Sequence, residues 1–351
     1  MKIKSTILCI IALVLLNVFL GSTVLANEAE YTMKFAATMP AIPMESMVYD
    51  QFVAFKTEVE SKTEGRIKVE YYGSGQLGEH DEMITGIMEG SIEIASTDAG
   101  PLASFDANID VISIPYLFPS DEIAWRVLDG KLGEILSEGL EEKGIKVVGG
   151  FLPKGFRHFT NSKRPIHSVK DMEGLKFRVM ENQLFIKMVE GLGASAHPMD
   201  PSKMYLALQT GTVDGQENPF SVIGPYSLFE VQKYLTLDGH SIGCQVAIMN
   251  SDYLNNLPAE LREIVLVAFR NATVAARGSV AAYNAHSLLD LATKFDETYF
   301  PSDEELAEFQ TKAQGPVVEW LKTKIGSEII DLAFSEVEEA KKELKSGFYL
   351  K

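Results

Sequence analysis

Two short segments of the chain carry residues that could bind a small anion. Gly-Leu-Lys-Phe-Arg-Val at 174–179 alternates like a short strand and delivers one arginine, Arg178. Asp-Gly-Gln-Glu-Asn-Pro at 214–219 is turn-rich, and its proline holds Asn218 in an extended conformation. A guanidinium presents a planar fork of donors that matches a carboxylate, and an amide can add a further hydrogen bond. Together the two segments indicate a site for a small carboxylate.

Each of these residues also has a structural interpretation. An arginine in a chain of formal net charge −17 often forms a salt bridge, and Asn-Pro is a common turn. Taken alone, Arg178 and Asn218 are each more often structural than functional. In an open parallel sheet, however, ligands collect beyond the carboxyl ends of the strands, where Arg178 is expected to lie. Their occurrence together therefore favours a binding site.

The N-terminus has the composition of a secretory signal peptide. Lys2 and Lys4 precede an apolar run over residues 7–20, and small residues lead to a cleavage site after Ala26. We therefore expect residues 1–26 to be removed on export. An uncleaved anchor is the alternative, but the apolar run is shorter than the roughly 20 residues that a membrane span requires. No comparable apolar run follows, so we expect a mature product that is not embedded in a membrane.

The charge and the cysteine content narrow the possible partners. Loss of two lysines with the signal peptide makes the net charge still more negative than −17, which disfavours nucleic acid and anionic membranes as partners. Cys244 is the single cysteine after residue 26, so an intramolecular disulfide is excluded in the mature chain. We expect Cys244 to be a buried core thiol.

Strand-like and helix-like segments alternate through the first two-thirds of the chain. Apolar periodicity predicts strands over 33–38, 66–72, 92–96 and 145–151, and helices around 48–59, 83–88 and 125–143. This alternation predicts an α/β fold with parallel strands and helices on both faces of the sheet.

The last third of the chain is predicted to be mostly helical. Residues 258–295 contain one proline, at the start, and one internal glycine, so we expect one unusually long helix. Ser302 and Glu305 form a capping box for a second helix, and residues 326–345 form a third.

Longer motifs surround the two candidate segments. They are Gly193-Ala194, Pro198-Met199, Tyr-Leu-Ala-Leu-Gln at 205–209, Gly-Gln-Leu-Gly at 75–78, Ile-Pro-Tyr-Leu-Phe at 114–118, and Arg157 with Thr160-Asn161 and Arg164-Pro165-Ile166. With the segments at 174–179 and 213–219, they closely resemble the DctP-type solute-binding proteins of TRAP transporters. The resemblance extends over nearly the whole mature chain.

The resemblance implies a fold and a function. The fold is that of a type II periplasmic binding protein, with two α/β lobes joined by a hinge and spanned by a long C-terminal helix. Lobe I is then 27–154 plus about 244–283, and lobe II is 155–243 plus about 284–351. Such a protein captures a small organic acid in the periplasm, a C4-dicarboxylate, hydroxy acid or sugar acid, and delivers it to the membrane permease without a cofactor or metal.

The resemblance also implies roles for five residues. Arg178 would bind the carboxylate of the ligand, and Asn218 would complete this contact. Arg157 would help from the side of the hinge, and Asp98 would bind hydroxyl or amine groups. His240 corresponds to a position near the ligand in the sialic-acid-binding branch of the family.

Two departures from the family pattern narrow the range of possible ligands. Thr38 replaces an asparagine of the sialic-acid branch, and Pro101 replaces an additional arginine, so sialic acid is disfavoured. Asp98 would repel a second carboxylate, which leaves a hydroxy acid or sugar acid in competition with a plain C4-dicarboxylate.

Two other classes of function are an enzyme and a sensor-type binding protein. Glu-His-Asp-Glu at 79–82 is superficially metal-like but lacks a second histidine at ligand spacing, and it is better interpreted as the solvated start of a helix. The chain has no nucleophile elbow, P-loop or dinucleotide-binding fingerprint, so we do not expect an enzyme. A binding protein that reports an organic acid to a receptor kinase would use the same fold and site, and it remains the alternative to transport.

Overall fold

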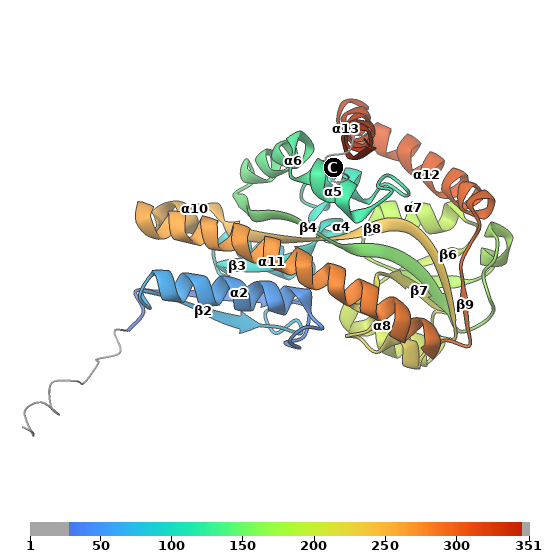
Figure 1. Ribbon diagram of the computed structural model, residues 1–351, viewed down its shortest axis with the longest axis horizontal. Helices are drawn as coiled ribbons and strands as arrows, with labels where there is room; N and C mark the ends of the chain where they lie inside the picture. The colour runs from blue at the N-terminus through green and yellow to red at the C-terminus, as the bar shows by residue number, and fades with distance from the viewer. Residues whose placement is uncertain (1–27, 346–351) are drawn as a thin grey trace, which may run out of the picture.

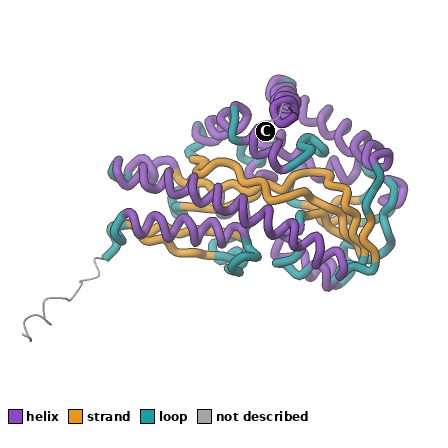
Figure 2. Tube along the Cα trace, in the orientation of Figure 1, coloured by secondary structure: helices purple, strands orange, loops and turns teal. Residues whose placement is uncertain are grey.

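A computed structural model describes residues 28–345 (Figures 1 and 2). The predicted signal peptide, residues 1–26, lies outside this range. The described strands form one sheet in the order β2-β1-β3-β8-β4-β7-β5-β6, with β9 paired to β8. Their bounds are β1 Tyr31–Ala37, β2 Ile67–Tyr72, β3 Ile94–Asp98, β4 Ile145–Asn161, β5 Lys176–Val179, β6 Ser195–Pro198, β7 Gly215–Asn218, β8 Tyr234–Asn250 and β9 Glu297–Tyr299.

The sheet has a parallel group of strands at each end. Strand β1 pairs in parallel with β2 and β3, and β5 pairs in parallel with β6 and β7. Between them, β4 and β8 are antiparallel to each other, to β3 and to β7. The prediction of parallel strands is therefore confirmed at the two ends of the sheet and wrong in its centre. The two α/β halves are joined by the long central strands.

The central strands are longer than the sequence pattern predicts. Strand β4 has 17 residues and continues well beyond the predicted strand at 145–151. Gly149, Gly150 and Gly155 adopt positive φ angles, and the register of β4 against β8 shifts around them. Such residues usually end a strand, but at a bulge they bend it and let pairing resume. The bulges therefore allow one strand to pass through both halves.

Helices cover both faces of the sheet (Figure 1). Their bounds are α2 Met47–Lys62, α3 His80–Glu89, α4 Ala99–Leu102, α5 Asp121–Leu128, α6 Lys131–Glu141, α7 Gln183–Gly191, α8 Pro201–Gln209, α9 Phe220–Ile223, α10 Ser251–Asn256, α11 Ala259–Leu291, α12 Asp303–Ile325 and α13 Glu328–Lys345; short 3-10 turns are η1 Ala107–Ser113, η2 Val169–Met172, η3 Leu228–Glu230 and η4 Ala292–Lys294.

The long C-terminal helix is confirmed. Helix α11 has 33 residues and passes through Gly278 without interruption. It packs on α2 in the first half of the molecule and on α9 in the second, and it crosses β4 (Figure 1). The capping box of Ser302 and Glu305 at α12 is also confirmed. The single helix predicted over 125–143 is instead two helices, because α5 ends at its C-cap Asp129 and Gly130 is the N-cap of α6.

Alternating strand residues build separate cores on the two faces of the sheet. In the first half, Phe35 and Met249 face α2 and α11, whereas Ala36 and Ile248 face a cluster with α3, α5 and α6. In the second half, α7 and α12 cover one cluster and α8 and α9 another. Helix α13 packs on α5 and α6, although the prediction placed 284–351 in lobe II. The lobe boundaries stay a prediction, with α13 on the side of lobe I.

Helix α11 with its terminal turn is, by length and composition alone, apolar enough to cross a membrane. Its buried residues include Val265, Phe269 and Ala276, which pack in the core against α2 and the sheet. A central helix of a folded domain has the same composition, and the contacts of α11 are those of a core helix.

Candidate ligand-binding site

A cavity of about 460 Å³ lies between the two halves of the molecule. The first half contributes side chains that include Thr38, His80 and Asp98, and the second contributes Arg178 and Asn218. Pockets of this size accommodate small-molecule ligands. Residues at the ends of β3 and β5 line the cavity, and strands β8, β4 and β7 lie between these two strands in the sheet.

Arg178 lies on β5 and lines the cavity. It is 3% exposed, and its Nε and Nη2 donate hydrogen bonds to the carbonyl oxygen of Met199 at 3.0 and 2.7 Å. Burial lowers the pKa of Arg178 to about 10, so the guanidinium stays charged at neutral pH. Within residues 28–345 no carboxylate lies at ion-pair distance from it, and no hydrogen bond uses Nη1. Arg178 is thus a buried cation held in place by backbone and open to an anion.

Asn218 also lines the cavity, at the end of a strand. The structure makes residues 215–218 the strand β7, where the sequence indicated a turn, and the extended conformation before Pro219 is confirmed. The Asn218 Oδ1 accepts a hydrogen bond from Nη2 of Arg157 at 3.0 Å, while Nδ2 donates to Gln216 at 2.5 Å. A second Nδ2 contact, to the sulfur of Met204 at 3.6 Å, is weak. The amide is therefore fixed in orientation and keeps donor capacity for a ligand.

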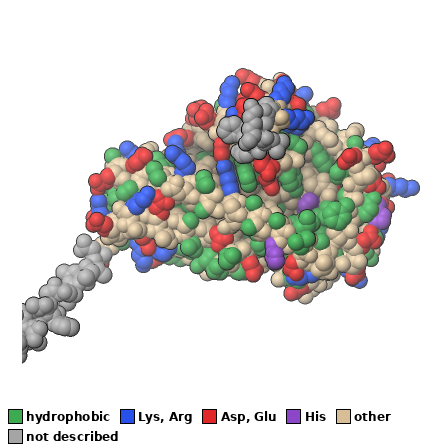
Figure 3. Space-filling view, viewed as in Figure 1, with side chains coloured by type: hydrophobic (Ala, Val, Ile, Leu, Met, Phe, Trp, Pro, Cys, Tyr) green, Lys and Arg blue, Asp and Glu red, His purple; other side chains and the backbone are tan. Residues whose placement is uncertain are grey.

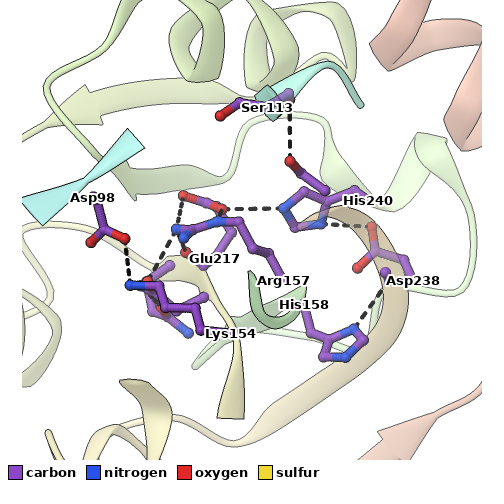
Figure 4. Close-up of polar contacts among 12 residues, drawn as sticks. Asp98, Ser113, Lys154, Arg157, His158, Glu217, Asp238 and His240 are labelled. Carbon is purple, nitrogen blue, oxygen red and sulfur yellow. Dashed lines mark hydrogen bonds and ion pairs between the residues drawn. The ribbon is translucent and has the colours of Figure 1, made fainter. Parts of the chain in front are cut away.

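Arg157 is not among the residues that line the cavity, and its guanidinium lies against Glu217 (Figure 4). It is 1% exposed, and its Nε and Nη2 donate to the carboxylate of Glu217 at 2.5 and 2.9 Å. Antiparallel pairing of β4 with β7 places the two residues on adjacent strands. The guanidinium charge of Arg157 is thus balanced by Glu217, and its contact with the cavity passes through Asn218. A direct role for Arg157 in ligand binding stays a prediction.

His240 is fully buried on the other side of Glu217 (Figure 4). Its Nε2 lies 3.2 Å from Oε2 of Glu217, and its Nδ1 lies 2.9 Å from Oδ2 of Asp238. Burial alone would lower the pKa of His240, but the two carboxylates outweigh it and raise the pKa to about 9. His240 does not line the cavity in this structure. That His240 lies near the ligand stays a prediction. In the structure its ring lies between the carboxylates of Glu217 and Asp238.

Asp98 lines the cavity and is paired with a lysine that the sequence analysis did not identify. Lys154, which is 1% exposed, forms an ion pair with Asp98 and also donates to Gln245 at 3.2 Å. Burial would raise the pKa of Asp98, but Lys154 and His80 hold it below its usual range. Because Lys154 neutralises Asp98, the repulsion expected for a second carboxylate at this point is reduced. An isolated lysine in the apolar run around 151–156 was the available signal.

His80 is the second cavity residue that sequence reasoning missed. The interpretation of residues 79–82 as a solvated helix start is wrong for His80, which is buried and hydrogen-bonded to Thr97 at 2.9 Å. Burial lowers the pKa of His80 to about 4, so the ring is neutral and can exchange hydrogen bonds with ligand hydroxyls. His80 shares a helical face with the buried Met83 and Ile84, which was the available signal.

Tyr226 adds a phenolic group to the wall. Its hydroxyl donates to the carbonyl oxygen of Thr38 at 3.0 Å, which connects the segment after α9 in the second half to the residue after β1 in the first. Burial raises the pKa of Tyr226 to about 12, so the hydroxyl is un-ionised at neutral pH. No local pattern around residue 226 indicates this contact, because it spans the two halves.

Carboxylates surround the rim of the cavity. Glu79, Asp81 and Glu82 at the start of α3 lie on one side, and Glu181 and Asp200, the latter paired with Lys203, lie on the other. A hydrogen bond with Asp200, together with burial, raises the pKa of Glu181 to about 7. In residues 28–345 no group of three or more such side chains is arranged to hold a metal ion. The rim therefore disfavours a second anionic group and offers acceptors for hydroxyls.

Cys244 lies in the hydrophobic core. It is 3% exposed, which confirms the expected burial, and burial raises the pKa of its thiol to about 12. A thiol of this kind stays protonated at neutral pH and is a poor nucleophile.

Comparison with known proteins finds a matching family and related binding proteins. The family model of the bacterial extracellular solute-binding proteins of family 7, DctP, matches residues 40–323. The C4-dicarboxylate-binding periplasmic protein DctP of Rhodobacter capsulatus is 30% identical over 283 residues, which are 79% of this chain and 83% of that protein.

Solved structures share the fold. The sugar acid binding protein DctPAm from Advenella mimigardefordensis, in complex with galactonate, has a TM-score of 0.84 and 31% identity over 90% of this chain and 100% of its own. A TRAP periplasmic solute binding protein from Polaromonas, bound to D-erythronate, has a TM-score of 0.81 and 32% identity over 87% and 98%. These counterparts are substrate-binding proteins and not enzymes, in agreement with the sequence analysis.

Proposed function

Since this chain belongs to the bacterial extracellular solute-binding proteins of family 7, we propose that it binds a small hydroxylated monocarboxylate, such as a sugar acid, and delivers it to a TRAP-type permease. The observation that carries the proposal is Arg178, a charged and buried arginine that faces the cavity without a carboxylate partner among the described residues. Burying such a charge is costly unless an anion compensates it. A ligand carboxylate supplies that compensation.

The charges of the cavity favour one carboxylate. Arg178 and Lys154 contribute two positive charges near its inner wall, and Asp98 contributes one negative charge. The inner wall therefore has an excess of one positive charge. The acidic rim would repel a second carboxylate, whereas Asp98, His80 and the rim offer hydrogen-bonding partners for hydroxyls. A C4-dicarboxylate is thus disfavoured relative to a sugar acid.

Transport requires release as well as capture. We propose that the two halves close on the ligand by bending of β4 and β8, in the hinge mode of two-domain binding proteins. Contacts to Arg178 from one half and to Asp98 from the other stabilise the closed state, since only differential contacts shift such an equilibrium. Residues 1–26 direct export to the periplasm, where the closed protein meets the permease.

Calorimetric titration with matched acids and polyols tests this function. We expect D-galactonate or D-erythronate to bind, and the corresponding neutral polyols, galactitol and erythritol, to bind at least about 100-fold more weakly because they lack the carboxylate. Succinate, with two carboxylates, should bind more weakly than the better sugar acid. Equal binding of acid and polyol would contradict the proposal, as would binding of none of the acids.

Asn218→Ala should weaken acid binding less than loss of the arginine charge. The variant removes one neutral donor and frees the Arg157 contact at 3.0 Å, so we expect a loss of about 1–3 kcal/mol, or about 5- to 150-fold in Kd. Calorimetry with the best acid measures the effect. Asn255→Ala, at an exposed position on α10, is the control and should bind like the wild type. An unchanged Kd in Asn218→Ala would remove Asn218 from the binding site.

A further inference from the structure

Lys154 is a buried lysine in the wall of the cavity. On the face of the molecule shown in Figure 3, lysine and arginine side chains lie at the surface beside acidic ones, whereas Lys154 is only 1% exposed. A lysine is rarely buried to this extent unless it is paired, because its charge loses hydration. The partner of Lys154 is the carboxylate of Asp98, with which it forms an ion pair (Figure 4).

Three neighbouring strands fix the position of this ion pair. Asp98 ends β3, Gln245 pairs with it on β8, and Lys154 lies on β4. Nζ of Lys154 donates to Oε1 of Gln245 at 3.2 Å, and Nε2 of Gln245 donates to Ser96 at 3.1 Å. Gly243 leaves space for the aliphatic part of Lys154, since a Cβ at residue 243 would lie 2.9 Å from Cγ and 3.1 Å from Cε of the lysine. The sheet thus holds the amine in place from several sides.

Asp98 reaches the cavity with its other carboxylate oxygen. Oδ1 is the oxygen that pairs with Lys154, and 15% of the Asp98 side chain is exposed. Oδ2 lies 3.8 Å from Nε2 of His80, accepts no hydrogen bond within residues 28–345, and is not among the buried side-chain atoms that lack a partner. An ionised carboxylate only accepts hydrogen bonds. A hydroxyl group of a ligand can therefore donate to Oδ2, whereas a hydrogen atom or a keto oxygen at the same place cannot.

We propose that Lys154 is a positioning residue that makes the cavity selective for hydroxy acids, because it holds Asp98 ionised and fixed as the acceptor for a hydroxyl group of the ligand. This inference rests on the proposed function, in which Arg178 binds the carboxylate of the same ligand. Lys154 acts through Asp98 and does not have to touch the ligand itself. Burial would raise the pKa of Asp98, but the ion pair with Lys154 holds it below its usual range, so the carboxylate stays an acceptor at neutral pH.

A charge-balanced double variant, Lys154→Met/Asp98→Asn, tests the selectivity. Calorimetric titration at pH 7 compares D-galactonate with hexanoate, an acid of the same chain length without hydroxyl groups, whose binding is measured by competition. The variant removes one charge of each sign, so the inner wall keeps its excess of one positive charge and hexanoate should bind as it does to the wild type. D-Galactonate should bind about five-fold or more weakly, because the charged acceptor is lost. D-Erythronate and butanoate form the equivalent pair if the four-carbon acid binds better.

Lys154→Met alone gives a second readout, the pH dependence of binding. At pH 8 this variant leaves Asp98 as an unpaired negative charge that repels the ligand carboxylate. Protonation of Asp98, or of His80 beside it, removes that charge as the pH falls. Relative to the wild type, hexanoate should therefore bind about five-fold or more tightly at pH 5 than at pH 8. The double variant should lose this additional pH dependence.

The other charged and titratable groups around the ion pair are present in the wild type and in both variants. They are Arg157, Arg178, Cys244 and the carboxylates of the rim, among which Glu181 has a pKa of about 7. Their contributions are removed when each variant is compared with the wild type at the same pH.

Lys143→Met is the matched control. Lys143 also pairs with a buried aspartate, Asp106, at 2.9 Å, but it does not line the cavity, so both acids should bind this variant as they bind the wild type. A wild type that binds no acid would contradict the proposed function and this inference with it. An unchanged ratio of galactonate to hexanoate affinity in both Lys154 variants, in protein that still binds hexanoate, would overturn this inference alone.

Discussion

Arg178→Ala is expected to abolish measurable binding of the organic acid. Two charge-assisted hydrogen bonds to a carboxylate contribute about 1.5–3 kcal/mol each, so their loss weakens binding by at least about 100-fold. Among residues 28–345, the other cations in or beside the cavity are already paired, Lys154 with Asp98, Lys203 with Asp200 and Arg157 with Glu217. Calorimetric titration with the acid that the wild type binds best measures the effect.

The control for Arg178→Ala is Arg164→Ala. Arg164 also donates from its guanidinium to backbone carbonyl oxygens, those of Asp171 and Glu173, but it is exposed and lies away from the cavity. Arg164→Ala should bind acid like the wild type. Arg178→Lys should recover only part of the affinity, since an ammonium cannot form the bidentate contact. Wild-type affinity in a folded Arg178→Ala protein would exclude Arg178 as the residue that binds the ligand carboxylate.

Glu217→Gln is expected to cause the largest loss of stability. Glu217 is fully buried between Arg157, whose Nη2 is 2.9 Å from Oε1, and His240, whose Nε2 is 3.2 Å from Oε2. The variant leaves a buried guanidinium without its carboxylate, a change that costs about 3–5 kcal/mol in other buried pairs. The free energy of unfolding from urea denaturation at pH 6.5 should fall by about this amount.

The effect of Glu217→Gln should depend on pH. A protonated His240 stabilises the fold fully below its unfolded pKa of about 6.5, and this contribution is lost as the pH rises through its folded pKa of about 9. Removal of Glu217 takes away one of the two carboxylates that raise that pKa. The stability difference between wild type and variant should therefore shrink from pH 6.5 to pH 9.

The control for Glu217→Gln is Glu343→Gln. This variant also removes a carboxylate from an arginine, Arg126, but the pair is exposed at the surface and screened by solvent. Its stability should change far less than that of Glu217→Gln. Equal effects of the two substitutions would show that burial does not increase the contribution of the Arg157–Glu217 pair to the free energy of unfolding.

Local patterns in the sequence were sufficient for most of the elements. The periodicity over 258–295 and the capping box of Ser302 and Glu305 depend only on neighbouring residues, and both are confirmed. The central strands were not predicted at full length, because Gly149, Gly150 and Gly155 have the composition of a turn. Only pairing with β8, about a hundred residues away along the chain, stabilises these bulges within one strand.

By itself, the sequence determined that Arg178 lies on a short strand of an α/β fold and that Asn218 is extended before its proline, and its motifs determined the family. These properties are local, since they follow from the alternation of a few residues and from the proline after Asn218. Tertiary structure alone decided which charges compensate one another. Pairing of β4 with β7 gives Glu217 to Arg157 and thereby leaves Arg178 open to an anion. Charge compensation in a protein interior depends on distance in space, which the order of residues does not specify.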